Sequence, residues 1–239
     1  MTRAAPAKRA ARRSRTAPSS PRPALSRDAI ADAGLRIARE GELEHITMAR
    51  LAAALGVTPM ALYRHFRSKS ELVDAILDRF VREAAVTAHG APKSDARTWL
   101  AGTFGAMHRA LVATPGVMPY LASGWRFGDA ARAVLDEVLG VLHAAGLSRR
   151  AAAEAMTTLL SFTIGSAGLA AAWQRGAPPD LAADAPPERR RRLRSRFAAV
   201  SRAQYPNLVE SAGDMALLTS PPRAFDAGLR IVLDGLPTP

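Results

Sequence analysis

The side chains best suited to chemistry lie between residues 58 and 69, and their chemistry is recognition rather than catalysis. Arg64 could donate two hydrogen bonds to a guanine, the commonest specific contact to a base edge, or it could meet a phosphate or solvent. Met60 shares the same face of an expected short helix, with Ala61 and Tyr63 beside it. Such a face fits the major groove of DNA, where each base pair presents a distinct pattern.

Motifs of catalysis are not found in the sequence. There is no Gly-x-Ser-x-Gly elbow, phosphate-binding glycine loop, dinucleotide fingerprint or His-Glu-x-x-His pair. The five histidines, at positions 45, 65, 89, 108 and 143, show no metal-ligand spacing, and the chain has no cysteine. We therefore expect a protein that is not an enzyme and that uses no metal and no cofactor.

Two short helices are expected to present the recognition face, as a helix-turn-helix over residues 47–66. Thr47 is a good N-cap for the first helix, and Gly56 supplies the positive φ of a tight turn. Thr58 followed by Pro59 is a second start signal. The inward side chains are Met48, Leu51, Ala52 and Leu55 in the first helix, and Leu62 and Phe66 in the second. The same caps would also fit a plain helical hairpin.

Helical periodicity continues along the chain with no strand alternation, so the predicted fold is all-α. Expected caps are Ser26, Ser68 with Glu71 as a capping box, and Ser148. The expected helices cover about residues 26–41, 69–88, 96–113, 129–145, 149–174 and 224–236, with a short irregular element near 117–124 and a short helix suggested by Phe197, Val200 and Tyr205.

Three regions are expected. Residues 1–25 would be a disordered basic arm, because they contain almost no apolar anchor. Residues 26–72 would form a helix-turn-helix domain, whose last helix, from about residue 70, links to the next domain. Residues 73–239 would form a larger helical domain with a flexible loop at about 176–195.

The formal net charge is +12, from 33 basic and 21 acidic residues. Seven basic residues and no acidic residue lie in 1–25, which leaves +5 for the rest of the chain. This excess favours an anionic partner, although a compositional bias of the genome would produce it too. The arm could follow a DNA groove or remain solvated. No apolar run approaches the roughly 20 residues of a membrane span, so we expect a cytoplasmic protein without membrane contact.

One stretch resembles a known family. Leu55-Gly56-Val57, followed by Leu62-Tyr63-Arg64-His65-Phe66-Arg67-Ser68-Lys69-Ser70-Glu71-Leu72, is similar to the DNA-binding domain of tetracycline-repressor-type (TetR) regulators. The resemblance covers about residues 26–80. It is weaker at Leu159–Leu169 and Phe225–Leu236, which look like the regulatory half of the tetracycline-repressor subgroup.

The resemblance implies a DNA-contacting set made of Thr47, Thr58, Pro59, Met60, Ala61, Tyr63, Arg64, His65 and Lys69. Base edges would be met by Pro59, Met60, Ala61 and Arg64. Tyr63 and His65 match positions that meet phosphates or flanking bases, while Thr47 and Lys69 match positions that bind the phosphate backbone. Ala49 stands where tetracycline repressors have a base-reading arginine, so their operator sequence does not transfer.

The resemblance also implies a homodimer, held by helices at about 149–174 and 224–236, with an effector cavity in each monomer. Candidate lining residues, each of which is more often plain core than a ligand contact, are Trp99, Phe104, His108, Met118, Trp125, Leu139 and Phe162. The segment Gly116–Leu121 lacks the histidine that binds the magnesium–drug chelate in tetracycline repressors, which argues against that effector.

The expected function is that of a dimeric transcriptional repressor, released from a palindromic DNA operator by a small-molecule effector of unknown identity. The alternative is an effector-independent, architectural DNA-binding protein of the same fold.

Overall fold

The computed structural model describes residues 25–41, 43–86, 95–122, 128–176, 186–218 and 221–236, and these contain helices but no strands. The N-terminal helices are α1 (Arg27–Arg39), η1 (Leu43–His45), α2 (Met48–Leu55), α3 (Pro59–Tyr63) and α4 (Lys69–Val86). The middle of the chain forms α5 (Ala96–Ala113), η2 (Pro115–Val117), α6 (Met118–Ala122), α7 (Asp129–Ala144) and α8 (Arg149–Gly176). The last elements are α10 (Pro186–Ala198), α11 (Pro206–Glu210), α12 (Ala212–Leu218) and α13 (Pro221–Asp234).

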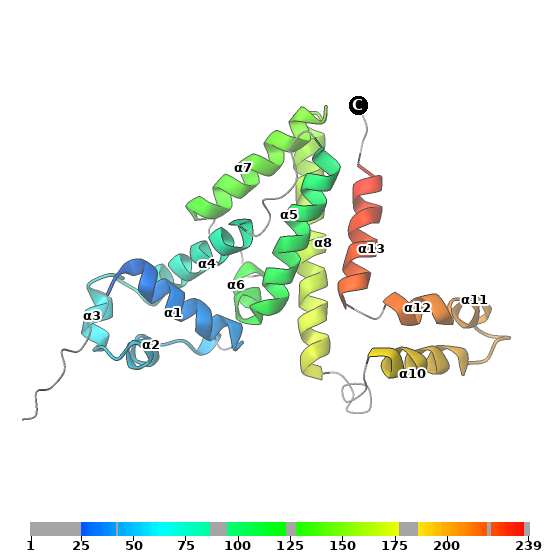
Figure 1. Ribbon diagram of the computed structural model, residues 1–239, viewed down its shortest axis with the longest axis horizontal. Coiled ribbons are helices and arrows are strands. Elements are labelled where there is room, and N and C mark those ends of the chain that lie inside the picture. Colours follow the sequence, from blue (N-terminus) through cyan, green and yellow to red (C-terminus); the bar gives the residue numbers. More distant parts are fainter. Residues whose placement is uncertain are drawn as a thin grey trace, which may run out of the picture.

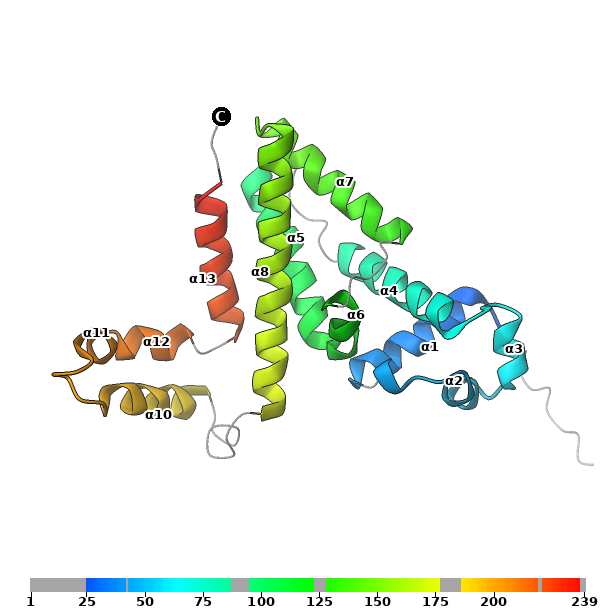
Figure 2. The same ribbon diagram turned by 180° about the vertical axis from the view of Figure 1, so that it is seen from behind.

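Helix α4 joins two groups of helices. It packs against α1, which together with α2 and α3 forms the outlying group on the left of Figure 1. Along its length it packs against α5 and α7. Helices α5, α8 and α13 lie side by side on the other side of the molecule, where α8 contacts both α5 and α13 (Figure 2). The all-α prediction is confirmed.

The N-caps predicted at Ser26, Thr47 and Ser148 are confirmed. The hydroxyls of Ser26 and Thr47 accept hydrogen bonds from the backbone N–H of Ala29 and Arg50. Asp95 caps α5, and the Ser148 hydroxyl accepts from Ala151. These oxygens satisfy backbone donors that the first turn of a helix leaves unpaired.

The two groups share one hydrophobic core. A cluster built around Ile30, Leu51, Leu62 and Ile76 continues into Leu111 and Val117, from α5 and η2. At this junction Gly116 lies so close to α1 that a Cβ atom there would come within 2.6 Å of the Ala38 carbonyl oxygen. A second cluster lies between α5, α7, α8 and α13. The end of α1 is therefore seated directly on the larger helical group.

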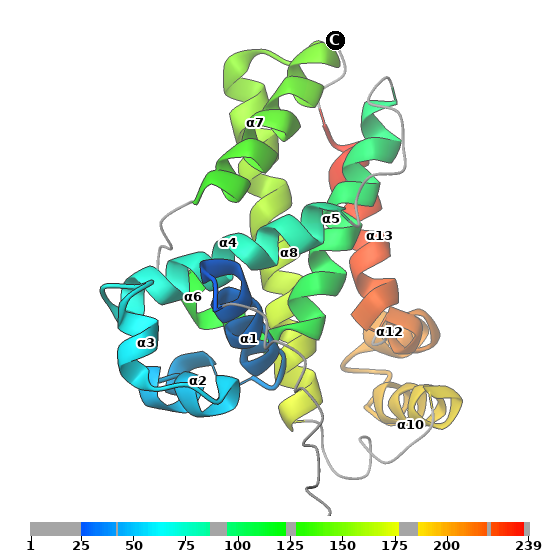
Figure 3. The ribbon, with the colours of Figure 1, turned by 60° about the vertical axis from the view of Figure 1, so that its left-hand side comes forward.

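The expectation of a flexible loop at about 176–195 is wrong from Pro186 onward. Pro186–Ala198 is the helix α10, which includes the arginine run, whereas Val200 and Tyr205 lie beyond its end. Helices α11 and α12 were not predicted, and α13 begins three residues earlier than expected. Leu193 of α10 packs with Ala216, Trp173 and Phe197, a cluster too small to give the sequence a clear apolar stripe. Figure 3 shows α10 and α12 side by side.

Three expectations fall outside the described residues: the arm, for which only residue 25 is described, most of the 176–188 loop, and Trp125. Within the described residues, one helix segment, Arg149–Trp173 of α8, is long and apolar enough by composition to cross a membrane. This segment packs against α5, α7 and α13.

Candidate nucleic-acid interface and ligand pocket

The turn between α2 and α3 has the geometry of a helix-turn-helix. Gly56 adopts φ +66° and ψ +33°, a left-handed conformation that glycine tolerates best. The N–H of Gly56 donates to the Ala53 carbonyl at 3.1 Å, and the N–H of Val57 donates to that of Ala52 at 3.0 Å. These bonds close α2 and set the direction in which α3 leaves the turn.

Helix α3 divides into a buried and an exposed face. Leu62 is fully buried, as is Phe66 just after the helix. On the opposite face, Met60 is 68% exposed and Tyr63 49% exposed, and the Arg64 side chain is exposed too. Both side chains are therefore accessible to a partner. Pro59, Met60, Tyr63 and Arg64 thus form one accessible surface, with Ala61 and His65 half-buried at its margins.

Two details differ from the expected recognition helix. Thr58 occupies the N-cap position of α3, but its side chain makes no capping hydrogen bond, which leaves the exposed hydroxyl accessible to a phosphate. The helix ends at Tyr63 rather than near residue 66, so Arg64 is its C-cap. Arg64 therefore projects from the end of the helix.

A brace missed by sequence reasoning holds the segment after α3. The guanidinium of Arg27, at the start of α1, donates to the His65 carbonyl oxygen and, at 2.8 Å, to the Glu71 carboxylate on α4. It also lies over the Phe66 ring, 4.2 Å from the centroid. Bonds from the Arg67 N–H and from Arg27 hold the pKa of Glu71 below its ordinary value.

The predicted capping box is confirmed in part. The Ser68 hydroxyl accepts from the Glu71 N–H at 3.1 Å, but the Glu71 carboxylate accepts from the N–H of Arg67, one residue before the expected donor. Lys69, which is predicted to bind the phosphate backbone of DNA, donates from Nζ to the Glu44 carbonyl oxygen at 3.1 Å. An ammonium group has three donors, so this bond positions Lys69 without using all of its capacity.

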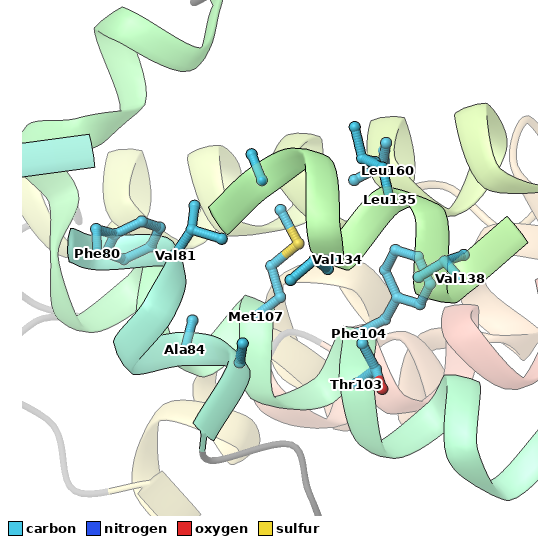
Figure 4. Close-up of a pocket in the computed structure, with 12 residues that line it drawn as sticks. Phe80, Val81, Ala84, Thr103, Phe104, Met107, Val134, Leu135, Val138 and Leu160 are labelled. Atoms are coloured by element: carbon cyan, nitrogen blue, oxygen red, sulfur yellow. The ribbon is translucent and has the colours of Figure 1, made fainter. Parts of the chain in front are cut away.

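An apolar pocket lies further along α4, between this helix and α5, α7 and α8. The cavity volume is about 70 Å³, and the pocket is partly open to solvent. The side chains that line it are Phe80, Val81, Ala84, Ala85, Thr103, Phe104, Met107, Ala131, Val134, Leu135, Val138 and Leu160. Figure 4 shows Met107 and Val134 near its middle, between Phe80 at one end and Val138 at the other.

Of the predicted lining residues that the structure describes, only Phe104 borders this pocket. Trp99 is buried in the adjoining core, and Leu139 packs against that core. Met118 lies against the first core cluster. Whether these side chains meet a ligand stays a prediction. The α4 contribution to the pocket was missed because its residues carry the same apolar periodicity as any core-facing helix.

His108 and Phe162 do not line this pocket, and both stack on the ring of Phe225 in α13. The His108 imidazole stacks on the Phe225 ring with the centroids 3.8 Å apart, and Phe162 stacks on Phe225 at 5.5 Å. His108 Nε2 lies 3.3 Å from the Ser166 hydroxyl. Burial lowers the pKa of His108; the charge of Asp226 acts in the opposite direction. His108 is thus part of the packing between α5, α8 and α13.

The outer faces of α8 and α13 carry exposed apolar side chains. Leu169 on α8 is 75% exposed and Ile231 on α13 is 72% exposed. A Cβ atom at Gly165, on the same helix as Leu169, would meet no described atom within 4 Å. Small residues here leave room for another helix to approach closely, and the predicted dimer would use this face.

Comparison with known proteins adds two family matches. Residues 30–76 match the family described as "Bacterial regulatory proteins, tetR family". Residues 91–239 match "Tetracyclin repressor-like, C-terminal domain". The class C tetracycline repressor protein of Escherichia coli is 30% identical over 218 residues, which is 89% of this chain and 90% of the repressor.

Solved structures agree with the architecture. A candidate TetR family transcriptional regulator from Streptomyces coelicolor A3(2) has 29% identity and a TM-score of 0.67, over 88% of this chain and 98% of that one. The Streptomyces coelicolor TetR family protein ActR, in complex with actinorhodin, has 22% identity and a TM-score of 0.72, over 90% of this chain and 96% of that one. At 22% identity, the likeness to ActR shows a shared fold.

Proposed function

This chain belongs to the tetR family of bacterial regulatory proteins, and from that premise we propose that it is a dimeric repressor that a small molecule releases from its operator. A DNA-binding transcriptional regulator is the function that the family establishes. The dimer, the palindromic operator and the effector site are the parts that we propose for this chain.

The observation that supports this proposal is that a single helix, α4, contributes to both the DNA-binding region and the apolar pocket. Its first residue, Lys69, lies next to the segment that follows α3, and its second half contributes Phe80, Val81, Ala84 and Ala85 to the apolar pocket. A ligand that is bound more tightly in one position of α4 than in another shifts the population towards that position. The recognition helix would move with α4, because Arg27 ties the end of α3 to Glu71.

Operator contact would use the accessible surface of α3. Pro59, Met60, Ala61 and Arg64 would meet base edges, while Tyr63, His65, Thr58, Thr47 and Lys69 would meet phosphates or flanking bases. The exposure of Met60 and Tyr63 supports this assignment. Arg64 projects from the end of the helix, a position from which a long side chain can reach a guanine.

Dimerisation would pair α8 and α13 with the same helices of a second copy. The exposure of Leu169 and Ile231 supports this, since isologous association would bury both. Two recognition helices related by a two-fold axis would then read two half-sites one helical turn or more apart.

ActR is known in complex with actinorhodin, and a TetR of Acinetobacter baumannii in complex with minocycline. For this chain the effector site would be the apolar pocket at α4.

The test is selection of bound duplexes from a random DNA pool, followed by footprinting and by mass measurement of the complex. We expect a sequence with dyad symmetry bound by two chains, and release by at least one member of a panel of neutral and charged small molecules. Binding without a symmetric sequence, with a steep salt dependence and no releasing compound, would instead identify an architectural DNA-binding protein.

A further inference from the structure

The wall of the α4 pocket indicates which chemical class of molecule it takes. We propose that the effector is an uncharged, mainly apolar small molecule that inserts between α4 and α7 and makes one hydrogen bond to the hydroxyl of Thr103. This inference rests on the proposed function and specifies the ligand of the same site.

The absence of charge among the described lining residues carries the first half of the argument. Eleven of the twelve lining side chains are hydrocarbon or thioether groups, and the twelfth is Thr103. An ionised group that enters such a site loses its hydration and gains no partner, which costs several kcal/mol. None of the described residues forms a cluster of carboxylate and imidazole groups that could hold a metal chelate. The pocket therefore selects against anions, cations and metal complexes.

Charged side chains lie close by but line a different crevice. On the other side of Phe80 and Ala84, a separate crevice is lined by Arg39, Glu83 and Arg109. Arg39 is already paired with Glu83 there. A charged ligand would find ionic partners in that crevice rather than in the apolar pocket.

Thr103 carries the second half of the argument. Its Oγ1 atom is buried and has no hydrogen-bond partner among the described residues, although a threonine in a helix commonly bonds to the carbonyl of the preceding turn. A buried, unpaired hydroxyl lowers stability, and a ligand that bonds to it recovers part of that free energy. A rotation of about 120° about χ1 moves Oγ1 to another staggered position, so the hydroxyl can turn towards a ligand without backbone movement.

Thr163 supplies the matched control. Its Oγ1 is also buried and unpaired, and the residue is fully buried on α8, but it does not line the pocket. Replacing either threonine by valine removes an unsatisfied hydroxyl at nearly constant shape. Only the Thr103 change would alter a hydrogen bond to a ligand.

The experiment compares two fluorescent probes on the full chain. N-phenyl-1-naphthylamine is uncharged and has one N–H donor, whereas 8-anilino-1-naphthalenesulfonate has the same rings and adds a sulfonate. We expect the neutral probe to bind at least about tenfold more tightly. Thr103→Val should weaken its binding by about two- to tenfold, Thr103→Ser should restore it, and Thr163→Val should leave it unchanged.

Equal or tighter binding of the sulfonate would overturn the proposal, as would neutral-probe binding that is insensitive to Thr103→Val in a folded protein. Operator release is measured separately. If the neutral probe binds as expected but no apolar compound releases DNA, the ligand class stands and the proposed regulation fails. If DNA is released only by charged compounds, the regulation stands and the ligand class fails.

Discussion

The Asp78 carboxylate on α4 accepts a hydrogen bond from the backbone N–H of Ala130 in the first turn of α7, with 2.8 Å between Oδ1 and N. Helix α7 begins after Gly128, which has no side chain to serve as a cap. Asp78 thus caps α7 although the bonded residue, Ala130, lies 52 positions later in the sequence. A Cβ atom on Gly128 would come within 2.5 Å of the same carboxylate oxygen. The bond fixes the start of α7 against α4, next to the apolar pocket.

Removal of this cap is expected to loosen α7. Asp78→Ala should lower the free energy of unfolding by about 1 kcal/mol, the usual effect of losing an N-cap. Asp74→Ala, one turn earlier on α4, is the control and should have a smaller effect. Urea unfolding monitored by circular dichroism would measure both. Equal stability of the two variants would mean that the Asp78 bond does not anchor α7.

The contact between Gly116 and Ala38 should be sensitive to a single methyl group. Gly116→Ala places a Cβ against a backbone carbonyl that cannot move without displacing α1, so we expect a loss of about 1–3 kcal/mol in unfolding free energy. DNA affinity should fall too, because α1 supports the helix-turn-helix. Gly140→Ala is the matched control: no described atom lies within 4 Å of its new Cβ, and it should stabilise α7 by about 0.5–1 kcal/mol. Thermal unfolding would rank the three proteins, and a neutral Gly116→Ala would show that α1 is not tightly seated.

Local signals predicted more of this fold than of its sites. Caps such as Thr47 and turns such as Gly56 depend on neighbours within a few residues, so the sequence alone placed α2 and α3. The arginine run of α10 was misjudged because little besides Leu193 and Phe197 marks its buried side. The signal for that helix is its packing against α12.

The sequence pattern could not predict contacts between residues that are far apart in the chain. Arg27 and Glu71 are 44 positions apart, and neither has a feature that marks it as half of a brace. The lining residues predicted from the sequence were mostly aromatic, whereas the pocket is lined mainly by small and aliphatic residues, including Ala84. The packing of α7 against α4 determines which face of α4 borders the pocket and which borders the core. A periodicity records burial alone.

Arg27 and Lys69 should affect DNA binding in different ways. Arg27 contacts protein groups, so Arg27→Gln should weaken specific binding severalfold through misplacement of the segment after α3, with little change in the salt dependence. Lys69→Gln should weaken binding to all sequences and reduce the slope of log affinity against log salt by about 1, as expected for a phosphate contact. Fluorescence anisotropy at several salt concentrations separates the two effects. An unchanged slope for Lys69→Gln would remove that residue from the phosphate contacts.

His108 should make the stability of the folded chain depend on pH. Burial lowers its pKa in the folded state, with a further contribution from Arg109 and opposition from Asp226, whereas the unfolded chain keeps an ordinary value near about 6.5. Between these two pKa values the unfolded state binds more protons than the folded state. Stability is therefore full above about pH 6.5 and falls as the pH drops towards the folded-state pKa.

His108→Phe, which keeps a ring to stack on Phe225, should show a smaller loss of melting temperature between pH 7.5 and 5 than the unmodified protein. His45→Gln, at an exposed position, should leave the loss unchanged. If His108→Phe and the unmodified protein lost the same number of degrees, the acid sensitivity would have to come from other groups.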